Sequence, residues 1–320
     1  MSKRIAVTDT VFPDLDPARD ALARVDGVLE LAADRTPESI IAVAGDADAM
    51  LVTYASITAE IIDQLTQCKA IGRFGIGTDN IDITAAHDAG IVVTYAPTYC
   101  LDEVSDHTMA LLLTLARKTA FSNAQVHSGT WDMPAVVPIN RLRGRTLGLV
   151  GIGNIPQRIV PKAQAFGIEV IASDPYAPAE VFERLGVRAV EFEELLSSSD
   201  YISVHAPLTA ETEGMFDADA FAAMKSDALL INTARGPLVD ADALADALEA
   251  GQLGGAALDV LPVEPPPPSS RLIGRDDVIL TPHTAFYSED SLLELQTTVA
   301  SDVATVLEGG TPRFPVPRRS

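Results

Sequence analysis

The chain has 320 residues, of which 47% are hydrophobic, and its formal net charge at pH 7 is −22. This length suits two domains, and no apolar run approaches the ~20 residues that a membrane span needs. A net charge this negative repels nucleic acid and anionic lipid, so both are excluded as partners. The acidic balance also raises the hypothesis of adaptation to high salt, where self-repulsion is screened.

Cysteine use and the first residues of the chain point to a reducing compartment. The two cysteines, Cys68 and Cys100, cannot form a disulfide framework. The chain moves from Lys3 and Arg4 directly into a strand-like run, without the pattern of a signal peptide. We therefore expect a cytoplasmic protein.

Short runs rich in β-branched residues alternate with helical patterns, which is typical of an α/β chain with parallel sheets. A helix is predicted over Thr58–Gln67, with Thr58 as its cap. A second helix, Val104–Lys118, is apolar nearly all round, which indicates burial between layers. The strands predicted in this first third are Arg4–Thr8, Ala49–Thr53, Ala70–Phe74 and Ile91–Tyr95.

A second α/β series begins at Thr146 and predicts one doubly wound domain of six or seven strands. Helices are predicted over Gln157–Phe166 and Ser288–Leu307. The strands predicted in this series are Thr146–Val150, Glu169–Ala172, Arg188–Val190, Tyr201–Val204, Ala228–Asn232, Ala256–Val260 and Val278–Thr281.

A glycine turn between the first strand and first helix of this series indicates a dinucleotide site. Gly151 and Gly153 permit a tight turn and close approach to a pyrophosphate at a helix N-terminus. Pro156 stands where a third glycine is usual, which a first helical turn tolerates, and Pro161 predicts a kink. Asp174 follows the next strand, where a carboxylate binds ribose hydroxyls and repels a 2′-phosphate, so NAD is favoured over NADP.

Three charged residues each follow a short apolar run, and such positions share one crevice in a parallel sheet. The guanidinium of Arg235 can hold a carboxylate and a carbonyl oxygen together. The imidazole of His283 can give or take a proton. The carboxylate of Glu264 would favour the charged form of that imidazole and orient its ring. We therefore predict these three as catalytic residues.

Five separate motifs stand at Gly72–Asp82, His205–Met215, Asn232–Gly236, Asp259–Pro265 and Thr281–Ala285. They resemble motifs of the D-isomer-specific 2-hydroxyacid dehydrogenases, and this resemblance covers almost the whole chain. Within that family, Arg73 and the run after His283 are most similar to the branch that contains the C-terminal-binding proteins and their bacterial relatives. That branch often has Trp where this chain has Phe286, so its substrate is not carried over.

The resemblance implies two doubly wound parallel-sheet domains. A Rossmann-type NAD-binding domain, residues 101–287, would be inserted into a discontinuous, flavodoxin-like substrate domain made of residues 1–100 plus 288–320. The segment Ser128–Trp131 resembles the arm that such proteins use for dimerisation, which implies a homodimer.

The resemblance also implies the residues of the site. Those expected to bind substrate are Arg73, Gly75, Ile76, Gly77 and Phe286. Those expected to bind the cofactor are Val104, Gly151, Gly153, Asn154, Ile155, Asp174, His205, Pro207, Thr212, Thr233, Ala234, Arg235, Asp259, His283 and Ala285.

The remaining histidines, His87, His107 and His127, are interpreted as packing or surface residues. No pair of histidines has the spacing of metal ligands, so no metal is expected.

The function expected from these features is hydride transfer between NAD and C2 of a small D-2-hydroxy acid or 2-oxo acid. Two alternatives stay open. One is an NADH-sensing regulatory protein like some C-terminal-binding proteins, because such binders can keep the three charged residues. The other is a phosphoglycerate dehydrogenase, although the substrate loop offers little positive charge beyond Arg73.

Overall fold

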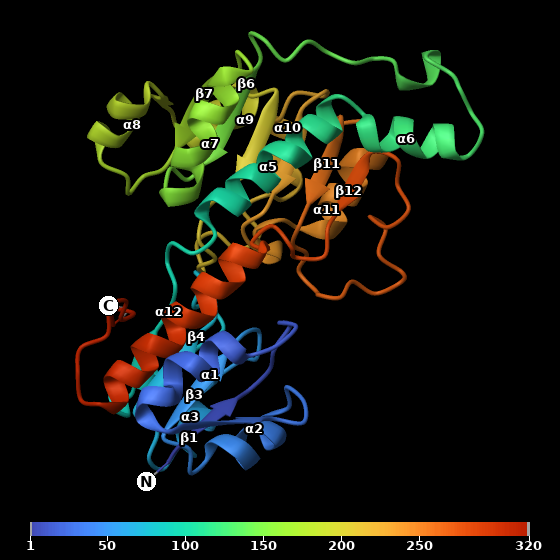
Figure 1. The fold of residues 1–320 in the computed structure, drawn as a ribbon. Helices are drawn as coiled ribbons and strands as arrows, with labels where there is room; N and C mark the ends of the chain where they lie inside the picture. The colour runs from blue at the N-terminus through green and yellow to red at the C-terminus, as the bar shows by residue number, and fades with distance from the viewer. Residues whose placement is uncertain (1, 319–320) are drawn as a thin grey trace. The chain divides into compact units, whose positions relative to one another are not determined.

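The computed structural model describes residues 2–318, which divide into two compact units (Figure 1). Unit 1 is formed by the residues up to Tyr99 together with those from Ser288 onward, and unit 2 spans Cys100–Tyr287. Within residues 2–318, no helix combines the length and apolar character that a membrane crossing requires.

Unit 1 contains, among its described residues, a five-stranded parallel sheet in the order β2-β1-β3-β4-β5. This is the flavodoxin-like order, which confirms the predicted fold class. The prediction missed β2, an edge strand in which Val28 and Leu31 are exposed. The strands are β1 (Lys3–Val7), β2 (Gly27–Leu31), β3 (Ala49–Val52), β4 (Ala70–Arg73) and β5 (Val92–Thr94).

The helices of unit 1 include one that is much shorter than predicted. Thr58 is the N-cap residue of α3, but that helix ends at Ile62 rather than Gln67. The long helix α12 begins as predicted, because Ser288 and Ser291 form a reciprocal capping box. The helices are α1 (Asp16–Leu22), α2 (Pro37–Ala44), α3 (Ala59–Ile62), α4 (Ile83–Asp88) and α12 (Glu289–Leu307), with a short 3₁₀ turn η1 (Ala23–Val25).

Unit 2 contains a seven-stranded parallel sheet, counted over its described residues, in the order β12-β11-β10-β9-β6-β7-β8. The strand order reverses between β6 and β9, and ligands bind beyond the carboxyl ends of strands at such a point. The strands are β6 (Thr146–Val150), β7 (Glu169–Ser173), β8 (Arg188–Ala189), β9 (Tyr201–Val204), β10 (Leu229–Asn232), β11 (Gly255–Leu258) and β12 (Val278–Leu280).

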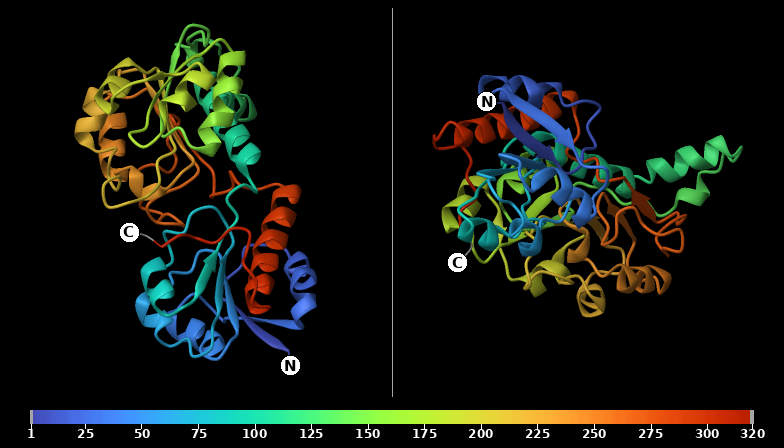
Figure 2. Two further views of the ribbon diagram at one scale, coloured as in Figure 1. Left: turned by 90° about the vertical axis from the view of Figure 1, so that its left-hand side faces the viewer. Right: turned by 90° about the horizontal axis from the view of Figure 1, so that it is seen from below.

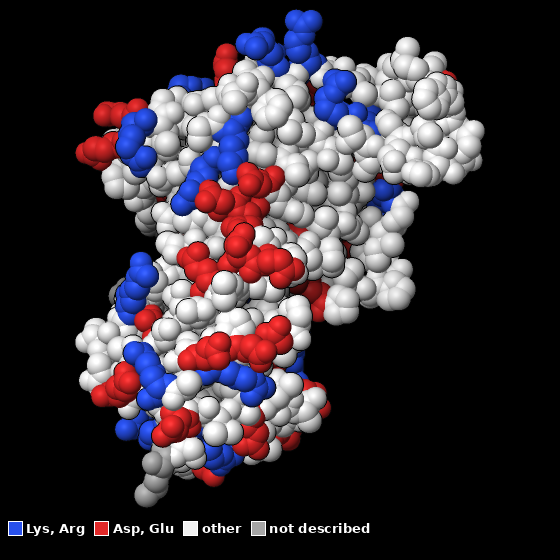
Figure 3. Space-filling view, viewed as in Figure 1, with Lys and Arg blue, Asp and Glu red and all other residues white. Residues whose placement is uncertain are grey.

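One helix of unit 2, α6, and the segment after it extend away from the sheet (Figures 1 and 2). This extension is almost free of charged side chains on the face shown in Figure 3. The helices of unit 2 are α5 (Leu101–Ala116), α6 (Thr119–His127), α7 (Asn154–Ala165), α8 (Ala179–Leu185), α9 (Phe192–Ser198), α10 (Ala218–Ala223) and α11 (Ala241–Glu249), with 3₁₀ turns η2 (Pro134–Val136) and η3 (Gly236–Leu238).

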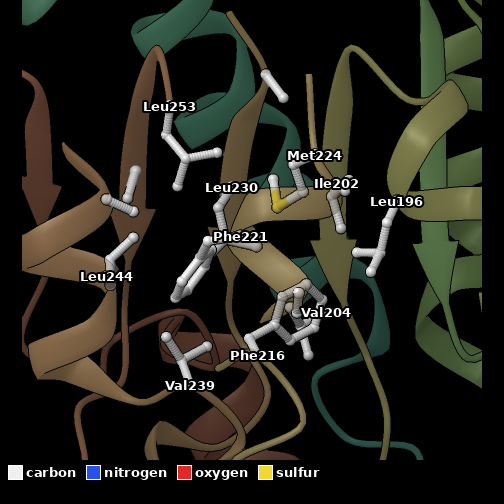
Figure 4. Close-up of a cluster of buried hydrophobic side chains, with 14 of the residues drawn as sticks. Leu196, Ile202, Val204, Phe216, Phe221, Met224, Leu230, Val239, Leu244 and Leu253 are labelled. Carbon is white, nitrogen blue, oxygen red and sulfur yellow. The ribbon is translucent and has the colours of Figure 1, made fainter. Parts of the chain in front are cut away.

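Separate hydrophobic cores cover the two faces of this sheet. On one face, Ile202 and Leu230 pack with Phe221 (Figure 4). On the other face, Ile231 packs in a cluster that includes Leu112 of α5. Because neighbouring residues of one strand enter opposite cores, β10 is buried on both faces. This double burial fixes the strand ends that carry the candidate site.

Candidate active site

Glu264 and His283 form a direct pair between the loops that follow β11 and β12. The His283 Nδ1 atom lies 2.7 Å from Glu264 Oε2, and Glu264 Oε1 accepts the Leu261 N–H at 3.0 Å. Burial alone would raise the pKa of the Glu264 carboxyl, but His283, the Leu261 N–H and the charge of Arg235 together lower it. The anionic carboxylate therefore receives Nδ1–H and leaves proton exchange to Nε2.

The backbone at His283 is left-handed, with φ of +52°, a conformation uncommon for a residue with a side chain. Its N–H donates to the carbonyl oxygens of Asp259 and Thr281, at 2.8 and 3.0 Å. The next two N–H groups, of Thr284 and Ala285, donate to the Asp259 carboxylate at 2.9 Å each. Asp259 is 2% exposed. Through these hydrogen bonds its buried side chain holds the loop that carries the His283 imidazole.

Arg235 follows β10, the neighbour of β11 in the sheet. Its Nη1 atom donates to the Ala234 carbonyl at 2.8 Å. The side chain of Asn232 stabilises the turn, because it accepts the Ala234 N–H and donates to the Arg235 carbonyl. The next residue is Gly236, where a Cβ atom would lie 2.0 Å from the carbonyl carbon of Leu261. Only glycine allows the two turns to approach so closely, and Leu261 begins the segment that leads to Glu264.

The turn between β6 and α7 is open and uncapped. Gly151 has φ of +94° and lies against the backbone of His205, so a side chain there is excluded. Gly153 is the N-cap residue of α7, which lacks a side-chain cap, and Asn154 is exposed. Helix α7 starts three residues earlier than predicted. The first N–H groups of any α-helix have no intrahelical acceptor. Ile155 is the second residue of α7, so its N–H is one of these groups.

Pro156 and Pro161 are both accommodated within α7. Pro156 is the third residue of the helix and is buried. Because N–H groups in the first turn have no intrahelical acceptor, the missing donor costs nothing there. The helix continues through Pro161 to Ala165, so this proline does not end it.

Asp174 follows β7 and contacts the glycine turn directly. Its Oδ2 atom accepts the Ile152 N–H at 2.9 Å, and its Oδ1 atom accepts the Tyr176 N–H at 3.0 Å. Each oxygen keeps a further lone pair for a ligand hydroxyl.

The loop after β9 supplies a partly buried, neutral histidine. Ser203 Oγ lies 2.8 Å from His205 Nε2, and burial lowers the pKa of His205 to about 3. The imidazole is therefore uncharged at neutral pH. Further along, Thr212 Oγ1 donates to the Pro207 carbonyl at 2.6 Å and accepts the Thr209 N–H, which closes a compact turn.

A hydroxyl pair links helix α5 to the loop after β10. Thr108 Oγ1 donates to the Val104 carbonyl at 2.7 Å and lies 2.8 Å from Thr233 Oγ1. Because the Thr108 hydrogen is used, Thr233 is the donor of this second bond. Val104 and Thr233, both predicted as cofactor residues, thus share one hydrogen-bonded chain.

The predicted substrate residues lie in both units. Within unit 2, the rings of Phe286 and His283 meet edge-on, with centroids 6.3 Å apart. Within unit 1, Arg73 is 9% exposed at the end of β4, and its Nη1 atom donates to the Phe74 carbonyl at 2.7 Å. Its guanidinium folds back over Gly75, the first residue of the predicted Gly75–Gly77 loop. Ile76, the middle residue of that loop, is partly exposed.

Residues 109–285 match the family model for the NAD-binding domain of D-isomer-specific 2-hydroxyacid dehydrogenases. The chain belongs to this family. It is 39% identical over 308 residues to D-3-phosphoglycerate dehydrogenase of Methanocaldococcus jannaschii, covering 96% of this chain and 58% of that relative. Among solved structures, the TT0316 protein of Thermus thermophilus is 34% identical with a TM-score of 0.90, covering 98% of this chain and 100% of that one. D-lactate dehydrogenase of Aquifex aeolicus, solved with NAD and lactic acid, has a TM-score of 0.87 at 28% identity, covering 95% and 96%.

These likenesses confirm the predicted 2-hydroxyacid dehydrogenase family, its fold and its NAD-binding domain. The chain spans about half the length of the curated relatives it matches, from 49% to 58% for the first two. Both of those relatives are named phosphoglycerate dehydrogenases, which is one of the alternatives that the sequence left open.

The turn after β6 fits the NAD cofactor of this family. A Cβ atom on Gly153 would meet nothing within 4 Å, so the backbone there is accessible to a bulky ligand. The free N–H groups at Asn154 and Ile155 suit pyrophosphate oxygens at the positive end of α7. The remaining lone pairs of Asp174 suit the ribose hydroxyls.

The structure also brings a residue to this candidate site that the sequence interpretation left out. His107 Nε2 lies 3.1 Å from Thr281 Oγ1 and 3.6 Å from Asp259 Oδ1, so its interpretation as ordinary packing or surface is incomplete. The available signal was that His107 and Thr108 stand directly before the apolar run Met109–Leu113 of this helix. Within residues 2–318, no three His, Cys, Asp or Glu side chains are grouped as metal ligands.

Proposed function

We propose that this chain is an NAD-dependent oxidoreductase that transfers hydride between the nicotinamide and C2 of a small D-2-hydroxy acid or 2-oxo acid. The observation that carries the proposal is the 2.7 Å pair of Glu264 and His283 beside Arg235, in a domain of the NAD-binding family. This arrangement combines an anion-binding group with an oriented acid–base group.

Arg235 and His283 have separate tasks in the reduction of a 2-oxo acid. The guanidinium of Arg235 would hold the substrate carboxylate and polarise its carbonyl oxygen. NADH, when bound, supplies the hydride. His283 Nε2 would donate a proton to the oxygen that gains negative charge, and in the reverse direction it would remove that proton.

Glu264 acts on the imidazole rather than on the substrate. Its carboxylate accepts Nδ1–H, which selects the ring orientation that turns Nε2 outward. Its negative charge lies 2.7 Å from the ring that would give and take the proton. The lowered pKa of Glu264 keeps this charge present through the neutral range.

The remaining assignments follow the family pattern and are part of the proposal. The Gly75–Gly77 loop, with Ile76 and the folded-back Arg73, would bind the substrate carboxylate, and Phe286 would line the pocket. Val104, Thr212, Thr233, Asp259 and Ala285 would surround the cofactor. Two contacts support this: the Thr233 hydroxyl is held by Thr108, and the Ala285 N–H is held by the Asp259 carboxylate.

A second candidate is oxidation of a phosphorylated 2-hydroxy acid. It is favoured by the curated relatives, which are named D-3-phosphoglycerate dehydrogenase. Such a substrate carries a second anionic group, which a basic residue of the substrate loop could bind. Arg73 is such a residue, and its guanidinium lies over the Gly75 backbone of that loop.

A substrate screen separates these functions. The purified chain would be mixed with NADH and with glyoxylate, hydroxypyruvate, pyruvate or 3-phosphohydroxypyruvate, and NADH oxidation would be followed at 340 nm. Turnover of an unphosphorylated acid supports the first function, and a strong preference for the phosphorylated acid supports the second. Tight NADH binding without turnover of any acid would contradict both and favour a regulatory binder.

We also infer a homodimer formed through the extension that contains α6. Its exposed apolar side chains include Trp131, which is 90% exposed, and Met133, which is 72% exposed. Residues 119–140 contain one Asp and no Lys or Arg, and Figure 3 shows the same uncharged surface. Exposed apolar area of this kind supports a protein interface, and a second copy of the chain is the partner that the family resemblance implies.

The cysteines support the proposal of a cytoplasmic location. Within the described part of the chain, neither Cys68 nor Cys100 takes part in a disulfide, and Cys100 is buried. Burial raises the pKa of the Cys68 thiol to about 12, which keeps it protonated and unreactive.

A further inference from the structure

We propose that His107 is a positioning residue for His283 and acts through Thr281 and Asp259. The inference rests on the proposed function, in which His283 is the acid–base group. It does not concern the Glu264–His283 pair itself, however, but a contact between helix α5 and the loop after β12. No motif in the sequence links these two segments, which are 174 residues apart.

Three side chains form a continuous chain of hydrogen bonds. His107 Nε2 lies 3.1 Å from Thr281 Oγ1, and Thr281 Oγ1 donates to Asp259 Oδ1 at 2.5 Å. His107 Nε2 is also 3.6 Å from the same Asp259 oxygen. The chain therefore runs from a helix, through a loop hydroxyl, to a carboxylate that is 2% exposed.

The direction of these bonds determines where the proton of His107 lies. The Asp259 carboxylate only accepts, and it already receives the N–H groups of Thr284 and Ala285. The single hydrogen of the Thr281 hydroxyl therefore points at Asp259, and the oxygen of that hydroxyl is left to accept. His107 must then carry hydrogen on Nε2 and donate it to Thr281.

This chain holds the backbone that aims His283. The left-handed conformation at His283 is sparsely populated for a residue with a side chain, and it persists only where its surroundings restrain it. Asp259 restrains it from both sides, through its own carbonyl to the His283 N–H and through its carboxylate to the next two N–H groups. His107 and Thr281 in turn fix the orientation of that carboxylate.

Helix α5 is suited to this role because it is 16 residues long and packs on the sheet through its apolar face. His107 is not part of that packing, since its side chain is 26% exposed. Its neighbour Thr108 contacts Thr233 after β10 in the same manner. Two consecutive polar residues of α5 thus reach the loops that carry Arg235 and His283.

The first test compares His107→Leu with His107→Gln. Leucine removes the donor, whereas the amide nitrogen of glutamine lies near the former Nε2 position and restores it. We expect His107→Leu to lower kcat for the best 2-oxo acid by roughly 10- to 100-fold, because misplacing the proton donor affects the transition state. KM and the Kd for NADH should change less than about threefold, and His107→Gln should recover most of kcat.

The matched control is His87→Leu, which removes a 3.1 Å histidine contact to the Val316 carbonyl within unit 1 and should leave kcat unchanged. Equal kcat in wild type and His107→Leu would overturn the proposal. So would an equal loss in His107→Leu and His107→Gln with a matching fall in Tm, because that pattern indicates a purely structural role.

A double-mutant cycle with Thr281→Val tests the route of the effect. If His107 acts through Thr281, the double variant should lose no more kcat than either single variant. Additive losses would overturn the route through this hydroxyl. Thr281→Ser, which keeps the hydroxyl, should retain most activity.

An activity-independent test distinguishes failure of this inference from failure of the proposed function. In a long-range ¹H–¹⁵N spectrum of the full chain, the histidine signals lost in His107→Gln should have the pattern of an Nε2–H imidazole. An Nδ1–H pattern would overturn the inference even in an active enzyme. If wild type reduces no 2-oxo acid, the proposed function fails, while this spectrum still decides whether the contact exists.

Discussion

Gly236 and Leu261 are in direct backbone contact, so that a Cβ atom on Gly236 would lie 2.0 Å from the Leu261 carbonyl carbon. The two residues belong to the turns after β10 and β11, which are neighbours in the sheet. This contact sets the separation between the turn that carries Arg235 and the segment that carries Glu264. The proposed acid–base pair and the proposed anion-binding group therefore depend on a position with no side chain.

Gly236→Ala should damage both folding and turnover. The new methyl group meets backbone rather than a flexible side chain, so one of the two turns must move, at a cost of ~1–3 kcal/mol. Urea unfolding measures the stability, and NADH oxidation measures the loss of kcat. The matched control is Gly251→Ala, where the methyl group meets open space and only the left-handed backbone is strained. Normal turnover in Gly236→Ala would contradict the idea that this contact positions Arg235.

His283→Asn should retain NADH binding and lose most reduction of 2-oxo acids. Loss of the proton donor is expected to lower kcat by about 10²- to 10⁴-fold. Fluorescence titration with NADH and steady-state kinetics separate the two effects. Glu264→Gln keeps a hydrogen-bond acceptor beside Nδ1 but removes the charge, so its loss should be smaller. Unchanged turnover in His283→Asn would rule out the acid–base assignment.

Asp174→Ala should relax the preference for NADH over NADPH. The variant would lose the ribose hydrogen bonds proposed for Asp174 and the repulsion of a 2′-phosphate, so the ratio of the two kcat/KM values should shift by roughly tenfold or more. Asp174 also accepts the N–H groups of Ile152 and Tyr176. Asp174→Asn is therefore the control that keeps one acceptor for the turn while it removes the charge. A wild-type preference for NADPH would show that the role assigned to Asp174 is wrong.

Asp200 should make part of the stability of unit 2 depend on pH. Burial alone would raise the pKa of Asp200, but the Thr146 N–H at 2.8 Å, together with Arg145 and Lys225, lowers it below its ordinary value of 3.8. A lowered pKa in the folded state means that the stabilisation is present above about pH 4 and is lost as the pH falls further.

The corresponding variant is Asp200→Asn, which should lose about 1–3 kcal/mol of unfolding free energy at pH 7. Its difference from wild type should shrink at pH 3, because the carboxyl of the unfolded chain is then largely protonated and folding must remove that proton. Urea unfolding at both pH values measures this. Glu183→Gln, at an exposed position on α8, should match wild type at both. If the difference in unfolding free energy between Asp200→Asn and wild type were the same at both pH values, the stabilising role of the Asp200 carboxylate would be contradicted.

Trp131→Glu combined with Met133→Glu should convert a dimer into a monomer. Both side chains are exposed within the extension that contains α6, and a charge in a buried apolar interface is unfavourable. Light scattering coupled to size-exclusion chromatography would give the mass of each form. A wild-type mass of a single chain would contradict the homodimer proposal.

The strands of both sheets were largely predictable because a parallel strand buried on both faces appears as a continuous apolar run. Ala49–Val52 and Leu229–Asn232 are of this kind, and their predicted limits differ from the observed ones by one residue. Strand β2 was missed because Val28 and Leu31 are exposed at the sheet edge. The helix predicted over Thr58–Gln67 was too long, because its cap and first turn do not reveal where tertiary packing ends it.

The sequence by itself determined the family, the α/β fold and the glycine turn with Asp174, because these depend on local patterns and on rules of strand order. Only the tertiary structure decided that His283 has a left-handed backbone, that Gly236 contacts Leu261, and that His107 reaches Thr281. The physical reason is that such contacts depend on which face of a helix meets which loop across a long stretch of chain. No period or spacing in the sequence specifies these contacts between helices and loops.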